Sequence, residues 1–178
     1  MLKILKNYTH ISQNFSKKCR SAIFFISYFI STGFFIGKIK YAPGTFGSLF
    51  AIIFCQYFIL LSQILQITVL SFLFLFGFFS VYFFLLLRQN KQDNDPKEVV
   101  IDEIVAVFFV SWLCKISRPF LLMDWRHFLF IFALFRLFDI LKPFPISWVD
   151  KNIHGAKGIM IDDLLAAIVC WFIFILSF

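Results

Sequence analysis

Six apolar runs, separated by short polar stretches, dominate the chain. The runs cover roughly residues 21–37, 46–66, 67–87, 99–114, 127–142 and 159–178. A helix needs about 20 mostly apolar residues to cross a bilayer. The second, third and sixth runs reach that length, the first is marginal, and the fourth and fifth are short and carry charges. The pattern therefore predicts an all-α membrane bundle with several transmembrane helices.

The composition also points to a membrane protein. Hydrophobic residues make up 61% of the 178 positions, and 29 of them are Phe, whereas a soluble domain is typically about 45–50% apolar. A chain of this size has too little interior to bury such an excess, so lipid must solvate part of it. The net charge is +7, but the basic residues lie between the apolar runs. This placement favours contact with anionic lipid headgroups over binding of nucleic acid.

The basic residues predict the topology as well, because the cytoplasmic loops of membrane proteins carry an excess of Lys and Arg. If the last five runs cross and the first lies in the interface or re-enters, thirteen basic residues face the cytoplasm and three face the far side. If the first run crosses too, the balance becomes eight against eight. We therefore expect five crossings, with residues 1–20 as a basic cytoplasmic segment and residues 21–178 as a single membrane-embedded domain.

Acidic residues lie at the cytoplasmic ends of three predicted helices. Asp102 and Glu103 begin the fourth run, Asp162 and Asp163 begin the sixth, and Asp139 lies near the end of the fifth. Charges in membrane helices are costly, and crowded carboxylates repel one another unless a cation holds them. Oxygen ligands suit Mg²⁺, so all five acids are candidate metal ligands and catalytic residues. The alternative is that acids in the first turn of a helix only complement its dipole.

Two basic residues flank Asp139 on the fifth run. Arg136, Asp139 and Lys142 follow at intervals of three residues, which places neighbours about 60° apart on one helix face. Pro143 and Pro145 then end the helix. Arg136 and Lys142 are candidates to bind a phosphate beside a metal ligand. The alternative is a structural ion pair between Arg136 and Asp139.

Two loops contribute further candidates. The turn Pro43-Gly-Thr-Phe-Gly-Ser48 opens the second run, and backbone N–H groups at a helix start attract anions. Thr45 and Ser48 are therefore candidate phosphate ligands, with an ordinary N-cap turn as the alternative. His154 lies in a glycine-flanked loop and is a candidate general acid. A solvated loop histidine fits the sequence equally well.

In combination, these motifs resemble the phosphatidylglycerophosphatase A family. The ordered set is Pro43-Gly-Thr-x-Gly-Ser48, Asp102-Glu103, Phe135-Arg-x-Phe-Asp139-x-x-Lys-Pro-x-Pro145, His154-Gly-x-x-Gly158 and Met160-x-Asp162-Asp163. It extends from about Gly37 to Ala167. The chain departs from the family pattern at Ala106, near which Gly is expected, and at Ala156-Lys157, where a further small residue is common. Neither departure removes a charged group.

The resemblance implies an all-helical, Mg²⁺-dependent enzyme of the bacterial inner membrane, whose site faces the cytoplasm. It would remove the terminal phosphate from phosphatidylglycerophosphate and leave phosphatidylglycerol. The nucleophile, water or Asp, stays open, as do the number of metal ions and the oligomeric state. Two alternatives remain. One is a phosphatase for another lipid or isoprenoid phosphate, and the other is a non-catalytic transporter, whose charges would lie nearer the middle of the membrane.

Overall fold

A computed structural model of the chain describes residues 2–88, 96–121 and 124–178, and in the first helix the side chains from Lys17 onward. Lys91, one of the thirteen cytoplasmic cations of the predicted topology, lies outside these residues, as do the side chains of Lys3 and Lys6. The described part is all-α, as the apolar runs predict. Its elements are α1 (Leu2–Ser31), the 3₁₀-helix η1 (Ile36–Lys38), α2 (Pro43–Phe58), α3 (Gln63–Leu87), α4 (Ile101–Ser117), α5 (Trp125–Leu141), α6 (Ile146–Asn152) and α7 (Ala156–Ser177).

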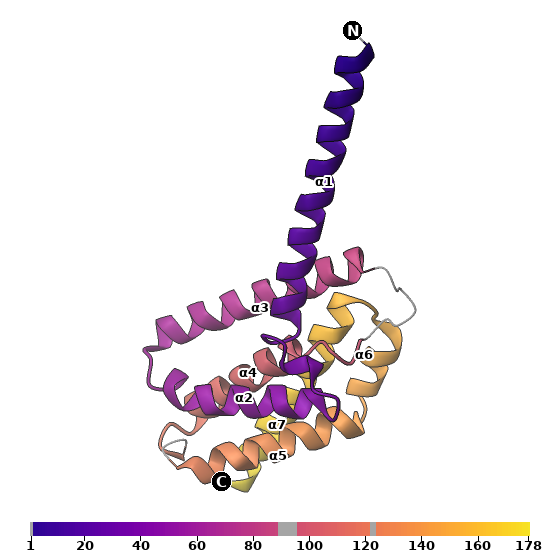
Figure 1. Cartoon of the computed structure of the whole chain (residues 1–178). Helices are drawn as coiled ribbons and strands as arrows, with labels where there is room; N and C mark the ends of the chain where they lie inside the picture. Colours follow the sequence, from indigo (N-terminus) through magenta and orange to yellow (C-terminus); the bar gives the residue numbers. More distant parts are fainter. Residues whose placement is uncertain (1, 89–95, 122–123) are drawn as a thin grey trace.

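Helices α2, α3, α4, α5 and α7 form a bundle (Figure 1). Helix α4 lies at its centre and packs against the other four. The core is built from small and branched residues of the central helices, among them Ala106, Val107, Val110, Ala166 and Ala167, all fully buried. Small residues let helix backbones approach closely where lipid is the solvent. This close approach fixes the helix ends relative to one another.

The two ends of the bundle have different composition. At one end, called the site end here, α2, α4 and α7 begin and α5 ends. At the opposite far end, α4 ends near the end of α2, where Lys115 Nζ donates to the carbonyl oxygen of Ile59. The end of α7 lies there too, since the His127 ring of α5 contacts the Phe178 ring at 4.7 Å between centroids.

The second apolar run is not one long helix, which corrects its expected boundary at Gln66. Helix α2 ends at Phe58 after 16 residues, and α3 begins at Gln63. The break is stabilised by the buried Gln66 side chain, whose Nε2 donates at 3.0 to 3.2 Å to the carbonyl oxygens of Phe58, the last residue of α2, and of Ile59 and Leu61 after it. Apolar residues continue through the break, so the sequence pattern alone does not reveal it.

Among the described helices, α3 (25 residues) and α7 (22 residues) are long and apolar enough to cross a membrane. Helix α2 is apolar but shorter, with 16 residues. Helices α4 and α5 have 17 residues each and carry the charges that the sequence places at their ends. The architecture is therefore an all-α bundle with two candidate membrane spans.

Helix α1 is set apart from this bundle. Figure 1 shows it crossing α3 at a steep angle and extending away from the other helices. Its C-terminal part is anchored beside the start of α4: Tyr28 Oη donates to Glu98 at 2.9 Å, and Val100 N donates to the Ser31 carbonyl at 3.0 Å. Three residues with positive φ, Gly33, Phe34 and Phe35, then turn the chain toward α2. The helix runs unbroken from Leu2, so it includes the basic N-terminal segment.

Candidate metal and phosphate site

The site end brings together carboxylates from α4 and α7. Asp102 and Glu103 lie in the first turn of α4, and Asp163 lies two turns into α7. One carboxylate oxygen from each of these three residues lies within 4.8 Å of the other two. Asp163 is only 4% exposed, and Glu103 Oε2 and Asp163 Oδ2 are buried without a hydrogen-bond partner. Buried polar atoms are normally satisfied, and a cation coordinated by these carboxylates would satisfy the two oxygens.

The helix dipole does not explain both acidic pairs. Helix α7 begins at Ala156, which places Asp162 and Asp163 beyond its first turn. The stabilising effect of the dipole falls off within the first turn. That alternative therefore applies to Asp102 and Glu103 alone. Asp163 is also repelled by the nearby charges of the other four predicted acids, Asp102, Glu103, Asp139 and Asp162.

Arg136 connects α5 to the acidic cluster. Its Nη1 donates to Asp139 Oδ2 at 2.5 Å and lies 3.7 Å from Glu103 Oε1. The three side chains are 13–15% exposed, so water screens these charges little. Arg136 Nε is buried without a hydrogen-bond acceptor. The ion pair considered from the sequence is thus present, and the same guanidinium keeps an unused donor beside the carboxylates.

Gly44 makes room for this arrangement at the start of α2. A Cβ atom on Gly44 would overlap Glu103 Oε1 and approach Arg136 Nη1 at 3.1 Å. One turn later, a Cβ atom on Gly47 would lie 3.0 Å from Cβ of Val100, next to the start of α4. Gly44 and Gly47 are three residues apart, so they lie on the same face of the helix. The glycines therefore allow the α2 backbone to approach the site residues.

Lys142 joins three elements at the edge of the site. It follows the last residue of α5 with a left-handed backbone (φ 42°). Its Nζ donates to Asp150 Oδ1 of α6 and to Asp162 Oδ2 of α7, both at 2.6 Å. Burial lowers the pKa of Lys142, but the hydrogen bonds and charges of the two carboxylates outweigh that effect and raise the pKa above its ordinary value. Lys142 is therefore a cation at neutral pH.

Asp150 is a residue that the sequence interpretation missed. It lies on the short helix α6, between the two prolines and His154, and its own side chain is 39% exposed. A single acid in an exposed segment carries little signal by itself. The indication available in the sequence was its position in the segment that links the two halves of the predicted site.

His154 lies close to these groups but outside the acidic cluster. It lines a cavity of about 50 Å³ together with Asp150, Asp162, Gly155 and Gly158. The His154 residue itself is exposed. Gly158 permits close packing of the loop, since a Cβ atom there would overlap the Ile153 carbonyl oxygen. The predicted general acid is thus adjacent to Asp162, on the Lys142 side of the site.

The two predicted hydroxyl ligands lie in the first two turns of α2. Thr45 is half-buried, and Ser48 is fully buried. Ser48 Oγ donates to the Gly44 carbonyl oxygen at 2.8 Å, so in this structure its proton is used within the helix. On α2, Gly44 lies directly beside the Glu103 carboxylate.

Comparisons with known proteins identify the family of the chain. The family model described as phosphatidylglycerophosphatase A matches residues 29–178. The chain belongs to the phosphatidylglycerophosphatase A family. The match covers every site residue discussed above and begins within α1, beyond its N-terminal turns.

Individual relatives support the same assignment. A phosphatidylglycerophosphatase A from Haemophilus influenzae is 40% identical over 146 residues, covering 78% of this chain and 80% of the relative. The Escherichia coli protein of that name is 34% identical over 144 residues, covering 79% and 76%. A Bacteroides thetaiotaomicron protein with the provisional name phosphatidylinositol-3-phosphatase is 35% identical over 150 residues, covering 81% and 88%. No solved structure gives a significant match.

Proposed function

We propose that this chain is a Mg²⁺-dependent phosphatidylglycerophosphatase. Family membership makes it a phosphoric monoester hydrolase that converts phosphatidylglycerophosphate to phosphatidylglycerol in phospholipid synthesis. The observation that carries the proposal beyond the family match is the carboxylate trio of buried Asp102, half-buried Glu103 and buried Asp163, which lies next to an arginine with an unused donor.

The donor set fits a magnesium ion. It consists only of carboxylate oxygens, which hard divalent cations prefer. Two of these oxygens are buried without a partner, and a cation would offset the repulsion between the acids. Asp102, Glu103 and Asp163 would hold the ion, with Asp139 and Asp162 at its periphery. When bound, the ion would neutralise phosphate charge and increase the acidity of a coordinated water.

The basic residues would bind the phosphomonoester. Arg136 is held by Asp139 in one orientation, and its fork of donors matches the geometry of phosphate oxygens. Lys142 is a cation beside Asp162, and two of the three N–H donors of its ammonium group bind Asp150 and Asp162, so the third can donate to a phosphate oxygen. Thr45, in the first turn of α2, and Ser48 remain further candidates for this role.

His154 would donate the proton that the leaving alcohol requires. The P–O bond to the glycerol oxygen breaks, that oxygen takes the proton, and a water molecule supplies the oxygen that completes the released phosphate. The order of these events depends on the nucleophile. Water attacks phosphorus directly, or an Asp carboxylate attacks first and water then hydrolyses the aspartyl phosphate. Both routes need the same charged groups.

The site end would face the cytoplasm of a bacterial inner membrane. In a five-crossing topology, α2, α3, α4, α5 and α7 span, and α1 lies in the interface. The steep crossing of α1 over α3 in Figure 1 supports an interfacial helix, because a helix that spans beside α3 would run nearly along it. The location of the acids at one end of α4 and α7 also favours an enzyme over a transporter.

A phosphate-release assay with the purified protein tests the proposal. Phosphatidylglycerophosphate in mixed micelles should release inorganic phosphate with Mg²⁺, and EDTA should abolish the release until Mg²⁺ is restored. Phosphatidylinositol 3-phosphate and an isoprenoid phosphate should react much more slowly. Faster phosphate release from either of these lipids than from phosphatidylglycerophosphate would contradict the proposed substrate. Release that persists in EDTA would overturn the metal assignment.

A further inference from the structure

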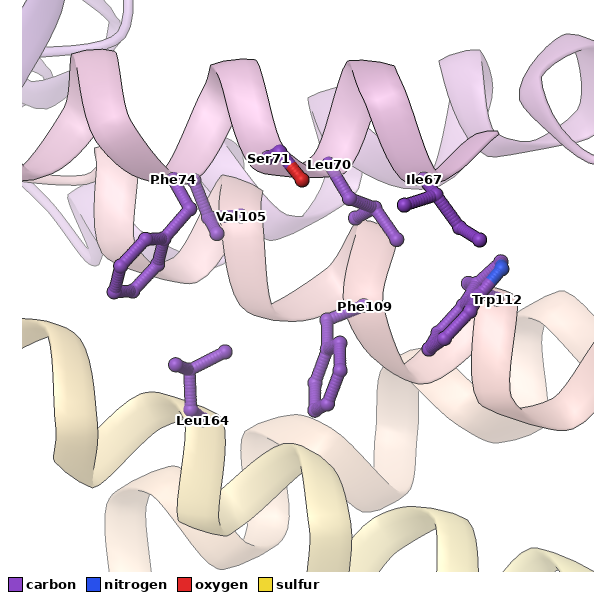
Figure 2. Close-up of a pocket in the computed structure, with 8 residues that line it drawn as sticks. All are labelled: Ile67, Leu70, Ser71, Phe74, Val105, Phe109, Trp112 and Leu164. Atoms are coloured by element: carbon purple, nitrogen blue, oxygen red, sulfur yellow. The ribbon is translucent and has the colours of Figure 1, made fainter. Parts of the chain in front are cut away.

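An apolar groove lies between α3, α4 and α7, on the side of the acidic cluster that faces the far end of the bundle. Figure 2 shows its lining, with Phe74 from α3, Phe109 from α4 and Leu164 from α7 directed into the same space. The groove has a volume of about 280 Å³. Among its lining residues, the only polar side-chain groups are the Ser71 hydroxyl and the Trp112 indole N–H. Such a lining suits a hydrocarbon ligand.

The groove starts next to the acidic cluster. Leu164 directly follows Asp163 in α7, and Val105 lies one turn after Asp102 in α4. On α4, residues 102, 105, 109 and 112 share one face, since they are spaced by three or four positions. The carboxylate end of this face is therefore continuous with the lining of the groove.

The depth of the groove matches one leaflet of a bilayer. At a rise of 1.5 Å per residue, Val105 lies about 4.5 Å and Trp112 about 15 Å along α4 from Asp102. The hydrocarbon core of a bilayer is about 30 Å thick, so one leaflet contributes about 15 Å. A phospholipid whose headgroup lies at the level of Asp102 would extend its acyl chains over this same range.

The walls of the groove also indicate that lipid reaches it. Helices α3 and α7, on either side, are the two described helices that qualify as membrane spans. The lining residues Ile67 and Ser71 are exposed on α3. A groove between two such helices opens toward the acyl chains of the bilayer and not toward the aqueous phase.

We propose that this groove holds one acyl chain of the phospholipid substrate while its phosphate occupies the acidic site. The inference rests on the proposed function and specifies how the lipid part of the substrate is recognised. A second, larger apolar cavity of about 470 Å³ lies between α1 and α3. It lies on a different face of α3, lined by Leu75, Phe79 and Phe83, and includes no residue of α4 or α7. It therefore lacks the continuity with the carboxylates that distinguishes the groove.

Ser71→Trp tests the proposal, because a large side chain at this position fills the groove without touching a charged residue. The substrates are phosphatidylglycerophosphates with two 16-carbon or two 6-carbon chains, presented in nonionic detergent micelles. For the long-chain substrate we expect kcat/KM to fall about tenfold, mainly through KM, because several methylenes lose their binding surface. For the short-chain substrate we expect a change within about twofold, because fewer methylenes reach Ser71.

Thr68→Trp is the matched control, since Thr68 is an exposed hydroxyl residue one turn earlier on α3 and lies outside the groove lining. Thr68→Trp should leave kcat/KM unchanged for both substrates. A chemical version avoids any folding defect: Ser71→Cys in a Cys19→Ser background is assayed before and after reaction with N-phenylmaleimide, with Thr68→Cys treated alike. The other three natural cysteines are buried.

The outcomes separate the groove from the activity. The proposal that the groove binds an acyl chain is supported if the changes at Ser71, but not those at Thr68, lower kcat/KM for the long-chain substrate alone. An equal loss with both chain lengths, or no loss after complete labelling, overturns it while the phosphatase assignment stands. If the unmodified protein releases no phosphate from either substrate, the proposed function itself fails.

Discussion

Lys115 and Gln66 at the far end of the bundle differ from Glu103 and Asp163 at the site end in whether the chain supplies their hydrogen-bond partners. At the far end, Lys115 Nζ donates to the carbonyl oxygens of Ile59 and Leu61, and Gln66 donates to three carbonyls in the same region. At the site end, Glu103 Oε2 and Asp163 Oδ2 are buried without hydrogen-bond partners. Charged groups in apolar surroundings are costly unless they are satisfied.

We interpret Lys115 and Gln66 as structural residues and the two carboxylates, which lie in a cluster of acids, as functional ones. The Lys115 and Gln66 side chains are satisfied by carbonyl groups of the chain itself, so their role is complete in the folded protein. Glu103 Oε2 and Asp163 Oδ2 at the site end have no such partner within the described part of the chain, so a bound ligand would have to supply one. Both sets of residues lie near helix ends, so position does not separate them. Their hydrogen-bond partners do.

Removal of one site-end carboxylate should have the largest effect on activity. Asp163→Asn and Asp102→Asn should each lower phosphate release by on the order of a hundredfold or more, since even residues that only orient metal ligands contribute about 10–100-fold. The stability of the protein should be unchanged or higher, because a buried charge is lost. Phosphate release and thermal unfolding in detergent measure the two effects.

The matched control for these variants is Asp124→Asn. Asp124 is an acid near the far end, where it caps α5 by accepting from Arg126 N at 2.9 Å. Asn caps helices as well as Asp does, so activity and stability should both be retained. Full activity in both Asp163→Asn and Asp102→Asn would show that the site-end carboxylates are not functional.

Gly44→Ala tests whether close backbone approach is needed at the site end. The added methyl group overlaps Glu103 Oε1, so it should displace the carboxylate and reduce kcat by about 10–100-fold, because a displacement of about 1 Å at a catalytic group can have that effect. Gly77→Ala is the comparison, since its Cβ would meet side-chain atoms at 3.2 Å or more. Gly77→Ala should affect kcat much less. Equal kcat values for the two variants would contradict the assignment.

Asp150→Asn should have a smaller effect, of about tenfold, because it weakens only one of the two carboxylate contacts of Lys142 and leaves a neutral hydrogen-bond acceptor. If Asp150 positions Lys142 for phosphate, the loss should appear in KM for the substrate. The loss should also disappear when Lys142 is already Met, so that the double variant resembles Lys142→Met alone. Lys151→Ala, an exposed neighbour, is the control. Additive losses in the double variant would show that Asp150 acts independently of Lys142.

Gln66→Leu should leave activity nearly unchanged and act on stability instead. The substitution removes hydrogen bonds to the carbonyls of Phe58, Ile59 and Leu61, and each such bond contributes about 0.5–1.5 kcal/mol. The three carbonyls keep their other donors, from Lys115 Nζ and Leu61 N. We expect a lower unfolding temperature with an unchanged kcat per folded molecule. A large fall in kcat at unchanged stability would mean that the far end is not merely structural.

Much of the site could be read from the sequence because charges inside apolar runs are conspicuous. Asp102, Glu103, Arg136, Asp139, Lys142, Asp162 and Asp163 were all predicted and all lie at one end of the bundle. Asp150 was missed because an acid in an exposed segment is ordinary. The end of α2 at Phe58 was also missed, since the chain there is apolar on both sides of the break and the Gln66 contacts that stabilise it are long-range.

The sequence by itself determined three things: that lipid surrounds part of the protein, that its fold is all-α, and which charged groups are available at the site end. These follow from composition, run length and charge position, which are local properties. Only the tertiary structure decided how the acids divide. Consecutive residues on a helix point about 100° apart, so Asp163 joins Asp102 and Glu103 in the cluster while its neighbour Asp162 binds Lys142. That division depends on where α4 and α5 lie around α7, which helix packing determines and no local pattern encodes.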